Sequence, residues 1–184
     1  MIQMQTKPIS MYPKVVDVYK QRFDRMAEQV CIRELVDYAK NVLHDPIEGL
    51  NWQQLLEWEH RHLKYTNGGL PKPRAEMPVE IILQSRGRCG EFALLYNGLL
   101  LANSYMCRLI VDCSTLTNKS KKSAGDHVWN EILVETMWLH IDPTEKRIDR
   151  KAMYCSEWNK DINLVYAISR DRTVDVTESY QSCQ

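Results

Sequence analysis

The sequence predicts an α+β fold in which helices come first and an antiparallel sheet follows. Up to Asn103, apolar residues recur at helical spacing, and beyond it they alternate with polar residues as in strands. A short connection joins the two clearest strand candidates, which is typical of antiparallel neighbours. The length of 184 residues suits one domain, so we expect a single domain over residues 1–184.

The composition excludes several classes of partner. Lys plus Arg and Asp plus Glu both number 24, and this zero net charge gives no reason to expect nucleic acid or an anionic membrane as a partner. The six cysteines include no C-x-x-C pair, so we expect no metal site and no cofactor. In a secreted protein they could form disulfides. The first residues carry no export signal and the apolar runs are too short for a bilayer, so we expect a cytoplasmic protein with reduced thiols.

The helical part begins after a leader, residues 1–13, which we expect to be loose because two prolines break it. Residues 15–43 carry apolar stripes at helical spacing, as one long helix or two joined ones. Asn51, with Gln54 three residues later, predicts the N-terminal cap of the next helix.

A further helix and the strands follow. A short apolar segment at 79–83 leads to a strongly apolar helix that begins near Cys89 and closes at Asn103. A polar, lysine-rich stretch at 114–125 is expected to be a surface loop. The strand candidates are residues 107–113, 127–134, 137–142, 163–169 and 173–177.

Cys89 is the candidate nucleophile. It lies between Gly-Arg and Gly-Glu at the predicted start of the apolar helix. There the thiol meets the positive end of the helix dipole, and Arg86 and Arg88 add positive charge nearby. Both effects favour the thiolate, which is the nucleophilic form. Because a lone cysteine is more often a small core residue, the assignment depends on partners for Cys89.

Two strands place candidate partners on one face of the sheet. Alternate residues of a strand share a face. An even-numbered turn around Glu135 brings the two sets of polar residues together, whereas a three-residue turn would separate them. We expect a wet face that gathers His127, Trp129, Glu131, Trp138, His140 and Asp142.

This face supplies the partners of a Cys-His-Asp triad. His127 would take the proton of Cys89 as a base and return it to the leaving amine as an acid. Asp142 would hold the imidazole in the required tautomer and orientation. Of the other histidines, His60 lies among charged residues and is expected to be solvated.

Three segments resemble the peptide:N-glycanase branch of the transglutaminase-like superfamily. They are residues 87–93 (GRCGEFA), 126–131 (DHVWNE) and 138–145 (WLHIDPTE). The resemblance extends over about residues 52–180. It implies a transglutaminase-like (papain-like) core, with the nucleophile at a helix N-terminus packed on an antiparallel sheet.

The resemblance also implies roles for single residues. The catalytic triad of the family falls on Cys89, His127 and Asp142. The positions that line its substrate cleft and contact the glycan fall on Trp129, Glu131 and Trp138. The implied reaction hydrolyses the amide between an N-glycan and Asn, leaving Asp, and its implied substrates are misfolded N-glycoproteins or glycopeptides in the cytoplasm.

The sequence departs from typical members of this branch ahead of the nucleophile. Those members carry two C-x-x-C pairs that form a zinc lobe, whereas residues 67–78 here are few and contain no cysteine. The lobe forms one wall of the cleft in those relatives. A cysteine protease or acyltransferase acting on peptide or Gln amides uses the same thioester chemistry and is the alternative. A non-catalytic binding module of the same fold is the second alternative.

Overall fold

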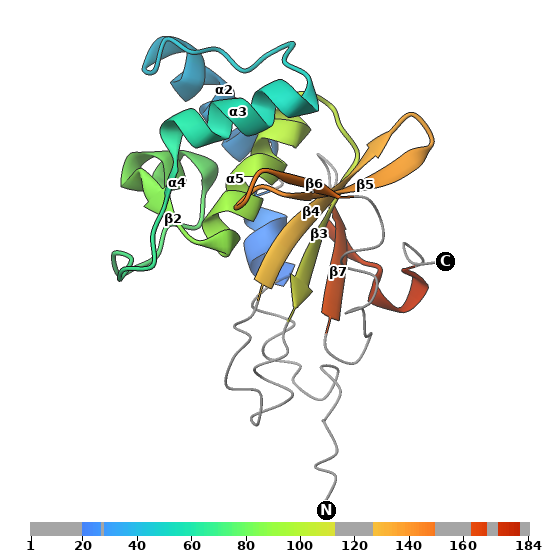
Figure 1. Cartoon of the computed structure of the whole chain (residues 1–184). Coiled ribbons are helices and arrows are strands. Elements are labelled where there is room, and N and C mark those ends of the chain that lie inside the picture. The colour runs from blue at the N-terminus through green and yellow to red at the C-terminus, as the bar shows by residue number, and fades with distance from the viewer. Residues whose placement is uncertain (1–19, 27, 113–126, 150–162, 169–172, 181–184) are drawn as a thin grey trace, which may run out of the picture.

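The computed structural model describes residues 20–26, 28–112, 127–149, 163–168 and 173–180. This part of the chain has two layers, a group of helices and a six-stranded sheet, with the helices on one face of the sheet (Figure 1). The arrangement confirms the predicted α+β class. The predicted leader and the polar loop at 114–125 lie outside the described residues.

The helices ahead of the sheet are α2 (Gln29–Asn41), α3 (Trp52–His62), α4 (Pro78–Gln84) and α5 (Cys89–Ala102). Residues 20–26 are helical as well, so the stretch predicted as one or two helices holds two helical segments. Asn51 caps α3 as predicted: its Oδ1 accepts from Gln54 N, and Gln54 Oε1 accepts from Asn51 N, both at 2.9 Å. The apolar segment at 79–83 forms most of α4, whose helical state the sequence pattern did not specify.

The sheet is antiparallel between all its described neighbours, in the order β6-β5-β4-β3-β7-β8. Its strands are β3 (Cys107–Asp112), β4 (His127–Val134), β5 (Met137–Asp142), β6 (Arg147–Asp149), β7 (Asn163–Ile168) and β8 (Thr173–Asp175). All the predicted strands are present, and β6 is an additional edge strand. A short 3₁₀ turn, η2 (Thr177–Ser179), follows β8, and ahead of α5 a parallel pair joins β1 (Lys64–Tyr65) to β2 (Arg86–Gly87).

Helix α5 lies between the other helices and the sheet (Figure 1). Its residues 91–101 are all buried, which requires neighbours on every side of the helix. The contact with α4 and α2 is close at Gly98, where an added Cβ would lie 3.0 Å from Pro78 Cγ and 3.3 Å from Leu35 Cδ2. Although α5 is apolar, no helix within the described ranges has both the length and the apolar character needed to cross a membrane.

Candidate active site

Cys89 is the first residue of α5, so its thiol lies at the helix N-terminus as predicted. Just ahead of it, Lys64 N donates to Ser85 O and Thr66 N donates to Gly87 O, both at 3.0 Å. These bonds between β1 and β2 fix the backbone that leads into the helix. The Cys89 side chain is half-buried, so the thiol lies at the rim of an otherwise buried helix.

His127 begins β4 and Asp142 ends β5, so the two lie at the same end of this hairpin. A two-residue turn joins the strands, and Glu135 adopts the left-handed region at φ 55° that such turns require. The register pairs Glu131 with His140, so odd positions of β4 and even positions of β5 share a face, as the turn parity predicts. His127 Nε2 and Asp142 Oδ2 are 2.6 Å apart.

The ring of His127 also contacts the candidate nucleophile. The Cys89 side chain is a hydrogen-bond partner of the His127 side chain. Burial by itself lowers the pKa of His127, but the hydrogen bonds and charges of Asp142 and Cys89 outweigh it and raise the pKa from 6.5 to about 10. The ring is therefore protonated at neutral pH, and an imidazolium beside a thiol stabilises the thiolate. The structure thus brings the three residues of the predicted triad together.

Two contacts hold Asp142 in place. Its second oxygen, Oδ1, accepts from Thr144 N at 3.0 Å in an Asx turn. The carbonyl oxygen of Pro143 accepts from His60 Nε2 at 2.6 Å, and the His60 ring packs on Phe92 of α5 with centroids 5.1 Å apart. The expectation that His60 is solvated is wrong, because its ring is partly buried between α3 and α5. Burial lowers the pKa of His60, and the neutral ring joins α3 to the turn that carries Asp142.

Glu59 is a second buried carboxyl group next to the site, and sequence reasoning missed it. It lies on α3 with no exposed surface. Burial raises the pKa of Glu59 well above its usual 4.5, and the negative charge of Asp142 raises it further. Glu59 therefore holds its proton to higher pH than an exposed glutamate does, which disfavours a second negative charge beside Asp142.

The face of the sheet that carries the His–Asp pair is buried, so the prediction of a wet face is wrong. Trp129 is 5% exposed, Glu131 0% and His140 1%. The indole Nε1 of Trp129 donates to His140 Nδ1 at 3.2 Å, so His140 Nε2 carries the ring hydrogen, 2.9 Å from Glu131 Oε1. The cover comes from the segment after β8, where the Tyr180 hydroxyl donates to Glu131 Oε1 at 2.5 Å.

These contacts give Trp129 and Glu131 roles inside the protein. The His127 ring stacks on Trp129 with centroids 5.9 Å and planes 22° apart. The bonded series from Trp129 through His140 to Glu131 therefore supports the ring of the candidate base. Glu131 Oε2 also lies 3.6 Å from the Arg108 guanidinium. The predicted contacts of Trp129 and Glu131 with a glycan stay predictions, and they require this cover to open.

Trp138 shares the face but lies at the turn end of β5, about 13 Å along the strand from Asp142. Arg108 covers its ring, with the guanidinium carbon 3.7 Å from the ring centroid. The indole borders an apolar cavity of about 410 Å³, together with Met106 and Val174. The structure therefore does not bring Trp138 to the triad, and its predicted contact with a glycan stays a prediction.

Comparison with known proteins defines the family. The transglutaminase-like superfamily matches residues 36–143, which include the candidate triad, and the chain belongs to this superfamily. Within it, the chain is similar to proteins named peptide-N(4)-(N-acetyl-beta-glucosaminyl)asparagine amidase. The relative from Arabidopsis thaliana is 36% identical over 110 residues, 59% of this chain and 14% of that protein. The relative from Caenorhabditis elegans is 36% identical over 110 residues, 59% of this chain and 16% of that protein.

These relatives confirm the resemblance to the peptide:N-glycanase branch, over part of their length. The chain spans about a sixth of the curated relatives it matches. Among solved structures, a Rad4/XPC nucleotide excision repair complex aligns with 99% of this chain and 53% of that chain, with a TM-score of 0.55 and 16% identity, which shows the fold alone.

In the described ranges, no three His, Cys, Asp or Glu side chains are grouped so that they could hold a metal ion.

The charge on His127 generates a first prediction. The ring should titrate near pH 10 in the wild-type protein and at clearly lower pH in Asp142→Asn, which lacks the partner charge. Because the folded-state pKa exceeds the unfolded one, the pair stabilises the fold fully below pH 6.5 and loses this contribution as the pH rises toward about 10. NMR titration of the ring protons, assigned with His127→Gln, measures both midpoints. A wild-type midpoint at or below the ordinary value would contradict the pairing.

The buried carboxyl of Glu59 generates a second prediction. In the folded protein it keeps its proton to higher pH than in the unfolded chain, so wild-type stability falls as the pH rises above 4.5. A neutral amide removes that loss, so Glu59→Gln should gain in Tm relative to wild type as the pH rises above 4.5. Glu57→Gln is the matched control on the same helix, because Glu57 is exposed and its bond to Lys146 lowers its pKa. A Tm difference for Glu59→Gln that does not change with pH would show that Glu59 is ionised.

Proposed function

We propose that this chain is the catalytic core of a cysteine amidase that cleaves the amide between an N-glycan and Asn, leaving Asp. The observation that carries the proposal is the arrangement of Cys89, His127 and Asp142, in which a thiol at a helix start contacts a base that a carboxylate orients. The substrate class is supported by the relatives, whose name is that of an amidase acting on glycosylated asparagine.

The protonation states of the site define the steps of the reaction. The Cys89 thiolate attacks the carbonyl carbon of the side-chain amide, and N–H groups in the first turn of α5 stabilise the oxyanion. His127 donates its proton to the amide nitrogen, the C–N bond breaks and a glycosylamine leaves. The acyl group remains on Cys89 as a thioester. Water then attacks the thioester while His127 takes a proton, and the released side chain is Asp.

The half-buried position of Cys89 supports an unfolded or short substrate. A side chain reaches a thiol at the rim of a helix more easily from an extended peptide than from a packed domain. Misfolded N-glycoproteins or glycopeptides in the cytoplasm are therefore the substrates and setting that we propose. A transglutaminase-like protease or acyltransferase would form the same thioester and differ in the acyl donor, or in using an amine in place of water.

The reactivity of the thiol is the first test of this proposal. Cys89 should be the fastest of the six cysteines to alkylate near neutral pH, because the His127 imidazolium stabilises its thiolate. Site-resolved iodoacetamide labelling followed by mass spectrometry measures all six rates. Cys107 is the reference for a buried thiol, since burial raises its pKa to about 12. His127→Ala should lower the alkylation rate of Cys89 and leave that of Cys107 unchanged. A Cys89 in the wild-type protein that is alkylated no faster than Cys31 would contradict an activated thiol.

The second test identifies the substrate. A denatured N-glycoprotein incubated with the protein in heavy-oxygen water should lose its glycan and gain Asp that carries the heavy oxygen at the former attachment site. Cys89→Ala and His127→Ala should abolish the release, and Asp142→Asn should slow it by about a thousandfold or more. Mass spectrometry of peptide and glycan reports both products, and the heavy oxygen marks hydrolysis that occurred during the incubation.

Other products would contradict the proposed substrate in different ways. Release of a glycan with Asn left on the peptide would mean cleavage within the sugar. Cleavage of unglycosylated peptide, or incorporation of an amine at Gln, without glycan release would assign the chain to the protease or acyltransferase alternative. In both cases the alkylation test still reports on the nucleophile.

A further inference from the structure

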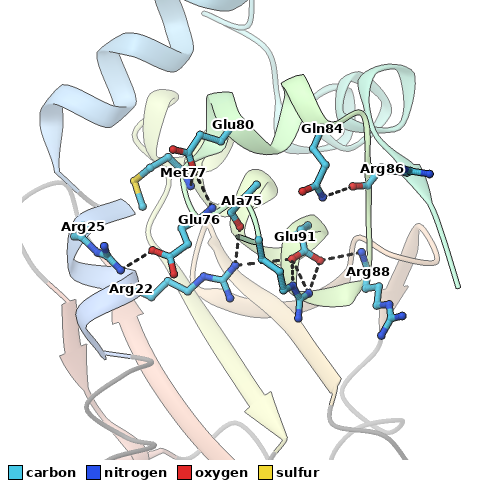
Figure 2. A network of polar contacts seen from close by, with 11 residues as sticks. Arg22, Arg25, Ala75, Glu76, Met77, Glu80, Gln84, Arg86, Arg88 and Glu91 are labelled. Carbon is cyan, nitrogen blue, oxygen red and sulfur yellow. Dashed lines mark hydrogen bonds and ion pairs between the residues drawn. The ribbon is translucent and has the colours of Figure 1, made fainter. Parts of the chain in front are cut away.

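Glu91 is a fully buried carboxylate in the first turn of α5, and in Figure 2 contacts from Arg22 and Arg88 meet at it. Its Oε2 accepts from Arg88 N at 3.0 Å, which fixes the residue just before Cys89. It also packs directly on Gly87, where an added Cβ would lie 2.5 Å from Glu91 Cβ. Glu91 therefore holds the backbone that leads into the helix and presents the nucleophile.

Arg74 supplies the counter-charge for this carboxylate. Its Nε donates to Glu91 Oε1 at 2.9 Å, and its Nη2 lies 2.6 Å from Oε1 and 2.7 Å from Oε2. Arg22 also approaches, but its Nη2 is 4.0 Å from Oε1. A carboxylate with no exposed surface is strongly destabilising unless a hydrogen-bonded cation pairs with it. The close fork of Arg74 is therefore the main compensation for the buried Glu91 carboxylate beside Cys89.

The loop that carries Arg74 is held directly after it, at Ala75 and Glu76. Arg22 Nη2 donates to Ala75 O at 3.1 Å, which ties the loop to the helical segment 20–26. Glu80 of α4 accepts from Glu76 N at 3.0 Å, which ties it to the next helix (Figure 2). The side chain of Arg74 is 49% exposed, so the fixed loop, rather than burial, sets its position.

We propose that Arg74 is a positioning residue for Cys89 and acts through Glu91. The inference rests on the proposed function in one respect, that Cys89 is the nucleophile. Arg74 keeps the Glu91 carboxylate against Arg88 N, and it cancels a negative charge that would otherwise lie in the same helical turn as the thiolate. Without Arg74, only Arg22 at 4.0 Å would remain as a cation, and a poorly compensated buried charge would oppose the thiolate and draw Glu91 toward solvent, away from the backbone it holds.

The pH profile of Cys89 alkylation tests this role on the full chain without any glycoprotein. Arg74→Met should slow the alkylation of Cys89 about tenfold near neutral pH and move the midpoint of the alkylation profile to higher pH. Arg74→Lys keeps the charge but not the fork, so it should fall between wild type and Arg74→Met. Glu91→Gln added to Arg74→Met should restore most of the rate, because it removes the unpaired charge.

Two controls separate positioning from general damage. Arg25→Met removes the exposed ion pair of Arg25 with Glu76 on the same loop, at 2.6 Å, and should leave the Cys89 profile unchanged. Cys107 is 2% exposed, so its protection from labelling reports that the fold is intact.

Each outcome bears on the proposal. A Cys89 profile unchanged in Arg74→Met overturns it, and so does failure of Glu91→Gln to restore the rate while Cys107 stays protected. If Arg74→Met unfolds, the Cys89 alkylation profiles of Arg74→Lys and of the double variant are compared with that of the wild-type protein. Profiles that match the wild-type profile in both variants overturn the proposal. Slow alkylation of Cys89 in the wild-type protein itself would instead count against the proposed function.

Discussion

The burial of α5 on all sides is the constraint from which the arrangement of the site follows. An apolar helix enclosed by α2, α3, α4 and the sheet leaves its first turn at the rim, and Cys89 occupies that turn. The helix is also bonded to the strand of the candidate base. Asn130 Nδ2 donates to Ala93 O at 3.1 Å and lies 3.4 Å from Asn97 Oδ1. Because Asn130 lies three residues after His127 in β4, these buried bonds set the helix of the candidate nucleophile against the strand of the candidate base.

The same burial requires every carboxyl group near the site to have a partner or a proton, and three groups meet this requirement in different ways. Asp142 is ionised and pairs with the His127 imidazolium at 2.6 Å. Glu91 has no exposed surface and is paired by the fork of Arg74. Glu59 is equally buried, and burial raises its pKa well above 4.5, which favours the neutral form. Of these three groups, the carboxylate of Asp142 is the one aimed at the base, while Glu91 serves the backbone of the helix start.

The sequence predicted the parts of the site that depend on local periodicity. Alternation along β4 and β5, with an even turn between them, predicted that His127 and Asp142 share a face, and their 2.6 Å contact agrees with it. The burial of that face was not predictable from alternation, because alternation does not report what lies above a sheet. Tyr180, which covers Glu131, is 49 residues away in sequence. The stretch at 79–83 was too short for its period to separate helix from strand.

Residues held by long-range contacts gave no such signal. Glu59 and His60 belong to a charged stretch of α3 whose pattern is typical of a solvated face. His60 nevertheless contacts Pro143, 83 residues later. Arg74 lies in a proline-containing loop without periodicity, and its bond to Glu91 spans 17 residues. A pattern of single residues identifies which face of an element is apolar, but it does not identify the partner of a buried charge.

Two groups at the site, His127 and Glu59, bind a proton more tightly in the folded protein than in the unfolded chain. The pKa of His127 rises from 6.5 to about 10, and that of Glu59 rises well above 4.5. Both shifts reduce stability as the pH rises, from 4.5 upward for Glu59 and between 6.5 and about 10 for His127. An ionised Glu59 would add a negative charge near Asp142, so the raised pKa of Glu59 favours the one-to-one pairing of Asp142 with the imidazolium. On the alkaline side His127 loses its proton over the same range in which the pair ceases to stabilise the fold, so the step in which we propose that His127 protonates the leaving nitrogen should weaken together with the hairpin end that carries the ring.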